Sequence, residues 1–86
     1  MEKDVTILNE EGLHARPAAV LVKKASSFSS DIQIKTADKK VNAKSLMSVM
    51  TLGLKKDAQL TIIANGEDAE VAINEMSKLV EDKFGL

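Results

Sequence analysis

Two hydrophobic periodicities alternate along this chain, and their order restricts its fold more than any other feature of the sequence. Residues 3–9 and 32–36 alternate apolar and polar side chains, as half-buried strands do. Residues 16–28 carry apolar side chains at helical spacing, and so does the stretch after Gly66. A chain with this pattern buries its apolar surface by packing helices onto a sheet.

The remaining segments complete the order β-α-β-β-α-β-α. A turn at Asp38-Lys39 leads to a short return strand over residues 40–43, a short apolar helix over 46–52 ends at Gly53, and residues 59–64 read as the fourth strand. The last helix is expected to bury a stripe formed by Ala69, Ala72, Ile73, Met76, Leu79 and Val80.

We expect an α+β fold with a four-stranded antiparallel sheet, in which the fourth strand lies between the first and the second. The three helices cover one face of this sheet, and the other face meets water, as in an open-faced β-sandwich. Residues 1–86 are expected to form a single domain. Because the chain has no cysteine, its stability must come from its core rather than from disulfides.

The composition excludes several classes of function. The formal net charge is −1 and neither Tyr nor Trp is present, which argues against nucleic-acid binding. No apolar stretch reaches the ~20 residues of a membrane span, so we expect no membrane insertion. The first residues lack the pattern of a signal peptide, so we expect a cytoplasmic protein. With one histidine and no cysteine, there is little for conventional hydrolase chemistry or for a metal site.

The most informative segment surrounds His14, which lies at the predicted start of a helix. The first N–H groups of a helix have no internal partner and, with the helix dipole, favour an anion. A phosphoryl group on His14 would accept hydrogen bonds from the backbone of Ala15 and Arg16, and the Arg16 guanidinium adds a planar donor. Pro17 has no N–H to offer and fixes the turn.

Simpler interpretations of these residues remain open. A lone histidine before a helix is more often a cap or a surface residue. Ser45 is a good N-cap for the short helix. Leu46, Met47 and Met50 have the helical spacing of core residues, although this helix is apolar on more than one side and Met suits an adaptable binding surface.

Three blocks of sequence closely resemble the HPr family, the histidine phosphocarriers of the bacterial phosphoenolpyruvate-dependent sugar phosphotransferase system. Residues 12–19 (GLHARPAA) resemble the family's active-site signature. Residues 41–53 (VNAKSLMSVMTLG) resemble its serine-site region, and residues 64–69 (ANGEDA) match the segment before its last helix. The resemblance extends over essentially the whole chain, including its length and the order of its elements.

The resemblance implies a role for each of these residues. His14 would accept a phosphoryl group on a ring nitrogen, Nδ1 in the family, from enzyme I and pass it to the IIA domains of sugar permeases. Arg16 would steady the phosphoryl charge. Such a protein is a carrier rather than an enzyme, uses no cofactor or metal, and is expected to be a monomer. An HPr-like paralogue that acts in a nitrogen-related or signalling branch through protein–protein interactions is the alternative.

The serine block implies a second, regulatory site. In HPr of low-GC Gram-positive bacteria, the serine that matches Ser45 is phosphorylated by HPr kinase/phosphorylase, and that form binds catabolite control protein A. The resemblance also implies that Ala19, Leu46, Met47 and Met50 form one docking face for partner proteins. Lys23 and Lys24 are candidates for its rim, although a solvated helix face is the simpler interpretation of each lysine.

Two residues depart from the family pattern. Glu11 stands where the family commonly has a small polar residue, and its carboxylate would act on His14, repel the incoming phosphoryl group or point into water. Ser48 stands where Gram-positive members usually have glycine, which affects the packing of the short helix or its contact with the kinase.

Overall fold

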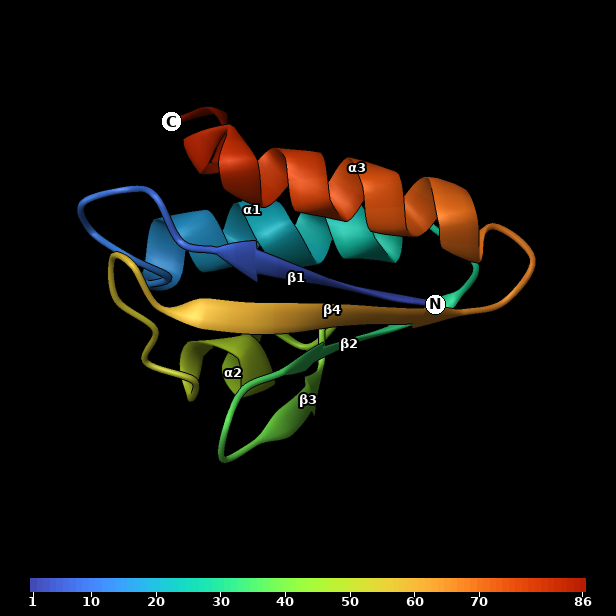
Figure 1. Cartoon of the computed structure of the whole chain (residues 1–86), viewed down its shortest axis with the longest axis horizontal. Coiled ribbons are helices and arrows are strands. Elements are labelled where there is room, and N and C mark those ends of the chain that lie inside the picture. Colours follow the sequence, from blue (N-terminus) through green and yellow to red (C-terminus); the bar gives the residue numbers. More distant parts are fainter.

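The computed structural model describes residues 1–86 and contains four strands and three α-helices (Figure 1). The strands are β1 (Glu2–Thr6), β2 (Asp31–Lys35), β3 (Lys40–Asn42) and β4 (Gln59–Asn65). The helices are α1 (Ala15–Ser26), α2 (Leu46–Met50) and α3 (Ala69–Glu81), followed by a 3-10 turn, η1 (Lys83–Gly85). This order confirms the one that the hydrophobic periodicities predict.

The four strands form one antiparallel sheet in the order β1-β4-β2-β3. The central strand, β4, pairs Leu60 with Val5 of β1 and Ile62 with Ile34 of β2. Because these paired residues are all buried, their side chains share one face of the sheet. The predicted position of the fourth strand between the first and the second is therefore confirmed.

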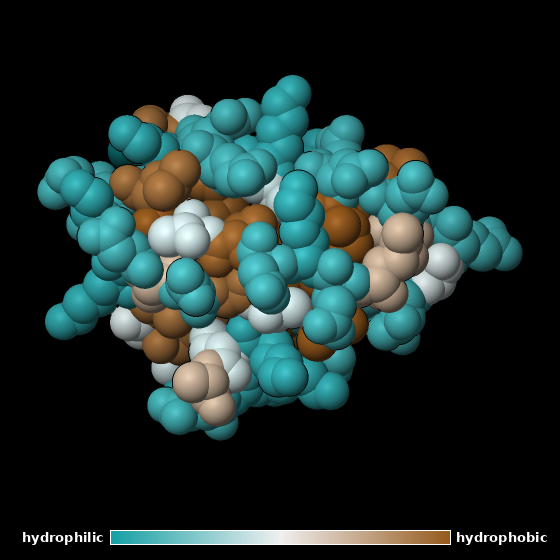
Figure 2. Space-filling model, in the orientation of Figure 1, coloured by the Kyte–Doolittle hydropathy of each residue, from teal (hydrophilic) through white to brown (hydrophobic).

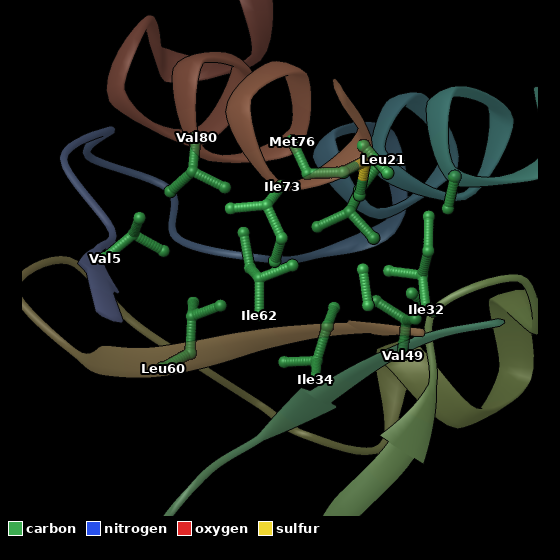
Figure 3. Close-up of a cluster of buried hydrophobic side chains, with 14 of the residues drawn as sticks. Val5, Leu21, Ile32, Ile34, Val49, Leu60, Ile62, Ile73, Met76 and Val80 are labelled. Carbon is green, nitrogen blue, oxygen red and sulfur yellow. The ribbon is translucent and has the colours of Figure 1, made fainter. Parts of the chain in front are cut away.

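The three helices pack on that face and close a core of 19 buried hydrophobic residues. In Figure 3, Ile73, Met76 and Val80 of α3 point toward side chains that rise from the sheet. The first and last α-helices also contact each other, and α2 contacts α1 and β3. From the short helix α2, Val49 is fully buried and joins this core. The helix layer thus fixes the positions of the loops at its ends.

Hydrophilic side chains cover most of the face shown in Figure 2. The opposite face of the sheet carries polar residues such as Thr61 and Gln33, which alternate with the buried ones along their strands. None of the helices has the length and hydrophobicity of a membrane-spanning segment. Seven large hydrophobic side chains are nevertheless exposed: Met1, Leu8, Leu46, Met47, Met50, Val71 and Leu86. Three of them, Leu46, Met47 and Met50, lie in α2.

Some element boundaries differ from the predicted ones. The first strand ends at Thr6 rather than at residue 9, because the ladder with β4 ends there. Beyond it, Ile7 stays buried and exchanges backbone hydrogen bonds with the loop before β4. The short helix ends at Met50 rather than at residue 52, since the N–H groups of Thr51 and Leu52 donate to the carbonyls three residues earlier, as in a 3-10 turn. In α3, Leu79 is only partly buried, unlike the rest of the predicted stripe.

The first helix, α1, ends at Ser26, two residues before the predicted end, because a distant carboxylate holds the chain that follows it. Asp68, at the start of α3, accepts hydrogen bonds from the backbone N–H groups of Ser29 and Ser30, at 3.0 and 2.9 Å, and from the Ser30 hydroxyl. The Ser30 hydroxyl and the Ser29 N–H lower the pKa of the Asp68 carboxyl to about 2. The carboxylate form therefore joins the end of α1 to the start of α3.

Replacing Asp68 with Asn is expected to lower the stability of the chain above about pH 4 and to remove part of its acid sensitivity. In the unfolded chain an Asp titrates near about 3.9. Since the folded-state pKa is lower, the contribution is fully present above that value and is lost as the pH falls toward about 2. Urea unfolding midpoints measured from pH 2 to pH 7 test this difference between the two chains.

Asp38, exposed in the β2–β3 turn, provides the control. Replacing Asp38 with Asn should leave the pH dependence of the midpoint as in the parent chain. Parallel pH profiles for the parent chain and the Asp68→Asn variant would contradict the role given to Asp68.

Candidate functional site

Hydrogen bonds to the loop before β4 and within the segment itself hold the loop between β1 and α1. Ile7 donates its backbone N–H to the carbonyl of Ala58 at 2.9 Å, and Leu13 donates to the carbonyl of Leu54 at 2.8 Å. Within the loop, the Asn9 side chain donates to the carbonyl of Gly12 at 2.7 Å. The sequence predicts Asn9 only as part of a loop, and the general tendency of Asn side chains to bond nearby backbone groups in turns is the one signal for this bond.

Gly12 makes this loop possible because it combines a left-handed backbone with close packing. Its φ is +71°, a region that other residues enter at a cost. A Cβ at this position would collide with the carbonyl oxygen of Leu54 and would lie 2.8 Å from the Cα of Lys55. The loop that leads to α1 therefore packs directly on the loop between α2 and β4.

His14 is the N-cap residue of α1, as the sequence predicts for the mouth of a helix. Its backbone is extended, with φ −100° and ψ −163°, and its carbonyl accepts the N–H of Ala18 at 2.8 Å. The imidazole makes no capping hydrogen bond and is 48% exposed. The backbone N–H groups of Ala15 and Arg16 lie in the first turn, where no carbonyl of the helix can accept from them. The exposed His14 ring and the free N–H groups of Ala15 and Arg16 thus lie together at the N-terminus of α1.

The side chains around the imidazole come from the same segment. Oε2 of Glu11 lies 3.4 Å from Nε2 of His14, so this carboxylate faces the ring rather than the solvent alone. Arg16 is exposed and forms no ion pair, which leaves its guanidinium free to reach an anion bound at the helix N-terminus. Pro17 is buried and anchors the first turn.

Ser45 is the N-cap of α2, which confirms the prediction made from its sequence. Its backbone is extended, and its hydroxyl accepts the N–H of Ser48 at 3.4 Å. Ser48 contributes through its backbone, so the capping bond does not depend on its side chain. Next to the cap, Lys44 donates its ammonium group to the carbonyl of Phe28 at 2.8 Å, which joins α2 to the end of α1.

The helix α2 exposes three apolar side chains. Met47 is 80% exposed, and Leu46 and Met50 are 42% and 43% exposed. The interpretation of these residues as core therefore does not hold, and Val49 is the core residue of this helix. Ala19 is exposed on α1, the helix that α2 contacts.

The two lysines considered for the rim of this surface differ. Lys23 is exposed and forms no ion pair. Lys24 lies toward α3, where its ammonium group is 2.6 Å from Glu75 and lowers the pKa of that carboxyl. Lys24 is therefore engaged between two helices rather than free at the exposed apolar surface.

Comparison with known proteins agrees with this arrangement. Residues 1–82 match the family described as "PTS HPr component phosphorylation site". The chain is 44% identical over 79 residues to the phosphocarrier protein HPr of Buchnera aphidicola subsp. Baizongia pistaciae. The aligned region covers 92% of this chain and 93% of the relative. The chain belongs to the HPr family of phosphocarrier proteins.

Solved HPr structures share the fold. An HPr structure from Thermoanaerobacter tengcongensis superposes with a TM-score of 0.95 and 46% identity, covering 100% of this chain and 97% of the other. A structure described as an HPr dimer from the same organism has a TM-score of 0.80 and 48% identity, over 95% and 94% of the two chains. The expected HPr-type α+β fold is thus confirmed, whereas the expected monomer stays a prediction.

Replacing Gly12 with Ala is expected to lower the free energy of unfolding of this HPr-family chain by about 3 kcal/mol. About 1–2 kcal/mol comes from the left-handed backbone, and the rest comes from the collision with Leu54. Gly53 is the matched control, because its φ is +58° and no atom lies within 4 Å of the added Cβ. Gly53→Ala should cost only the backbone part, about 1 kcal/mol. Equal losses in urea unfolding of the two variants would contradict the close packing at Gly12.

Proposed function

We propose that this chain carries a phosphoryl group on His14, which it accepts from phosphorylated enzyme I and donates to the IIA domains of sugar permeases. The observation that carries the proposal is the place of the exposed imidazole at the N-terminus of α1. The backbone donors of Ala15 and Arg16 provide hydrogen bonds to phosphoryl oxygens, and the helix dipole favours their negative charge. Membership of the HPr family supports the same chemistry.

The exposure of the site fits a group that must be passed on. Arg16 is a free, exposed guanidinium that adds hydrogen bonds without enclosing the phosphoryl group. Binding through a few exposed donors is modest, so the N–P bond stays available to the next acceptor. Transfer between two proteins also needs an uncovered ring, which the N-cap position of His14 provides.

The partners would dock on the apolar surface beside this site. We assign that role to Ala19 on α1 and to Leu46, Met47 and Met50 on α2, since they are exposed and their two helices are in contact. Flexible methionine side chains adapt to surfaces of different shape, which suits a carrier that meets a donor and several acceptors.

Ser45 would be the regulatory site, phosphorylated by HPr kinase/phosphorylase and, in that form, recognised by catabolite control protein A. Its hydroxyl is partly exposed and accepts a backbone N–H at the start of α2. A phosphate there would place negative charge beside the docking residue Leu46 without removing the cap. We further propose that residues 1–86 form a single domain and that the protein works as a monomer in the cytoplasm.

Incubation with enzyme I and phosphoenolpyruvate is expected to add one phosphoryl group to the chain. The measurement is intact mass, with a chase by IIA domains to follow onward transfer. His14→Ala should gain no mass while it keeps the unfolding midpoint of the parent chain, because the ring is exposed and makes no capping bond. A stable adduct on the variant would contradict the role of His14. Phosphorylation without transfer to any IIA domain would favour a signalling paralogue instead.

Replacing Ser45 with Asp is expected to slow phosphorylation of His14 by enzyme I about tenfold, because a negative charge at the edge of the docking surface opposes the partner. Ser45→Asn is the matched control, since Asn and Asp have the same shape and both cap helices well. Initial rates at low ionic strength, measured by intact mass, compare the three chains. Equal rates for the Asp and Asn variants would contradict an electrostatic role for this position.

A further inference from the structure

Glu11 is the carboxylate that contacts the candidate phosphoryl acceptor. Its Oε2 lies 3.4 Å from Nε2 of His14, and the side chains are 65% and 48% exposed. Burial does not force this contact. It forms within the loop between β1 and α1, whose backbone is fixed by the turn at Gly12 and by the bond from Asn9 to the carbonyl of Gly12.

The position of the carboxylate distinguishes the two ring nitrogens. A neutral imidazole carries its proton on one nitrogen and a lone pair on the other, and a neighbouring acceptor determines which form is favoured. A carboxylate 3.4 Å from Nε2 favours the proton on Nε2, because the positive end of the N–H dipole is then close to negative charge. The lone pair is then on Nδ1.

We propose that Glu11 is a positioning residue that holds the His14 proton on Nε2, so that Nδ1 is the nucleophile and the phosphorylated ring stays protonated and reactive. This inference rests on the proposed carrier function. It gives a role to Glu11, which departs from the pattern of the family at this position.

The transfer step balances without releasing a free proton. The Nδ1 lone pair of neutral His14 attacks the phosphorus of a donor phosphohistidine whose ring is protonated. An N–P bond forms to Nδ1 while the donor N–P bond breaks, and the donor leaves as a neutral imidazole. The His14 ring then carries the phosphoryl group on Nδ1 and a proton on Nε2, so it is cationic.

The Glu11 carboxylate stabilises that cationic ring, which is the form able to pass the group on. When the next acceptor attacks, the protonated ring leaves as a neutral imidazole rather than as an imidazolate. Deprotonation of Nε2 would make the ring a poor leaving group. Glu11 therefore acts on both halves of the carrier cycle through one contact.

The other charged groups near this pair do not replace Glu11. Glu10 is engaged with Lys56, at 3.0 Å, and the carboxylate raises the pKa of that ammonium group. Lys83 of η1 lines a surface pocket together with Glu10 and Glu11 but forms no ion pair with either. Arg16 and Lys55 likewise form no ion pair. Glu11 is thus the one carboxylate in contact with the ring.

The first test reads the tautomer directly. Ring 15N chemical shifts of neutral His14 are measured by NMR in the unphosphorylated parent chain, in Glu11→Ala and in Glu10→Ala. Glu11→Ala should lower the ratio of the Nε2–H to the Nδ1–H form by a factor of about two to five, the strength of an exposed charged contact. Glu10→Ala removes a neighbouring carboxylate that does not touch the ring, so it should keep the parent ratio. An unchanged ratio in Glu11→Ala, or an equal change in both variants, would overturn the inference.

The second test follows loss of the phosphoryl group. The three chains are phosphorylated with enzyme I and phosphoenolpyruvate, freed of enzyme, and incubated between pH 5 and pH 9. Near the upper end, phospho-Glu11→Ala should hydrolyse about two- to fivefold more slowly than the parent or Glu10→Ala, because it lacks the carboxylate that stabilises the cationic, reactive ring. Superimposed pH profiles would overturn the inference. Failure of the parent chain to be phosphorylated at all would instead refute the carrier function, and the tautomer ratios would still be decided.

Discussion

The backbone hydrogen bond from Leu13 to Leu54 joins the two loops on which the functional region depends. It connects the segment that ends at His14 to the loop between α2 and β4, at 2.8 Å. Gly12 packs against the same carbonyl, where a Cβ has no room. Earlier in the chain, Ile7 exchanges backbone hydrogen bonds with Asp57 and Ala58, in the same loop between α2 and β4. The N-terminus of α1 is therefore positioned by backbone contacts and by the core below it rather than by exposed side chains.

A fixed backbone with exposed side chains suits a protein that holds a group only briefly. The N–H groups of Ala15 and Arg16 have set directions, so in the proposed carrier function they would need little rearrangement to bind a phosphoryl group. The His14 ring above them is open to partners. Net hydrogen-bond contributions of about 1.5–3 kcal/mol to charged groups are enough to orient the phosphoryl group without trapping it.

The sequence predicts the elements and their order because buried side chains repeat with the period of a strand or of a helix. It also predicts His14 at a helix start, since that signal is local. The sequence predicts the end of α1 two residues too late, because the N–H groups of Ser29 and Ser30 bind Asp68, which lies far along the chain. The sequence leaves open whether Glu11 faces the ring or the solvent, because this depends on the direction in which the loop turns.

The amide NMR spectrum of the phosphorylated chain tests the central claim most directly, because that claim places the phosphoryl group on the N-terminus of α1. Spectra recorded before and after phosphorylation should show the largest downfield shifts at the amide protons of Ala15 and Arg16, which become hydrogen-bond donors to phosphoryl oxygens. Amides in the middle of α3 should stay in place. Unchanged Ala15 and Arg16 amides in a chain that carries one phosphoryl group on His14 would contradict the account.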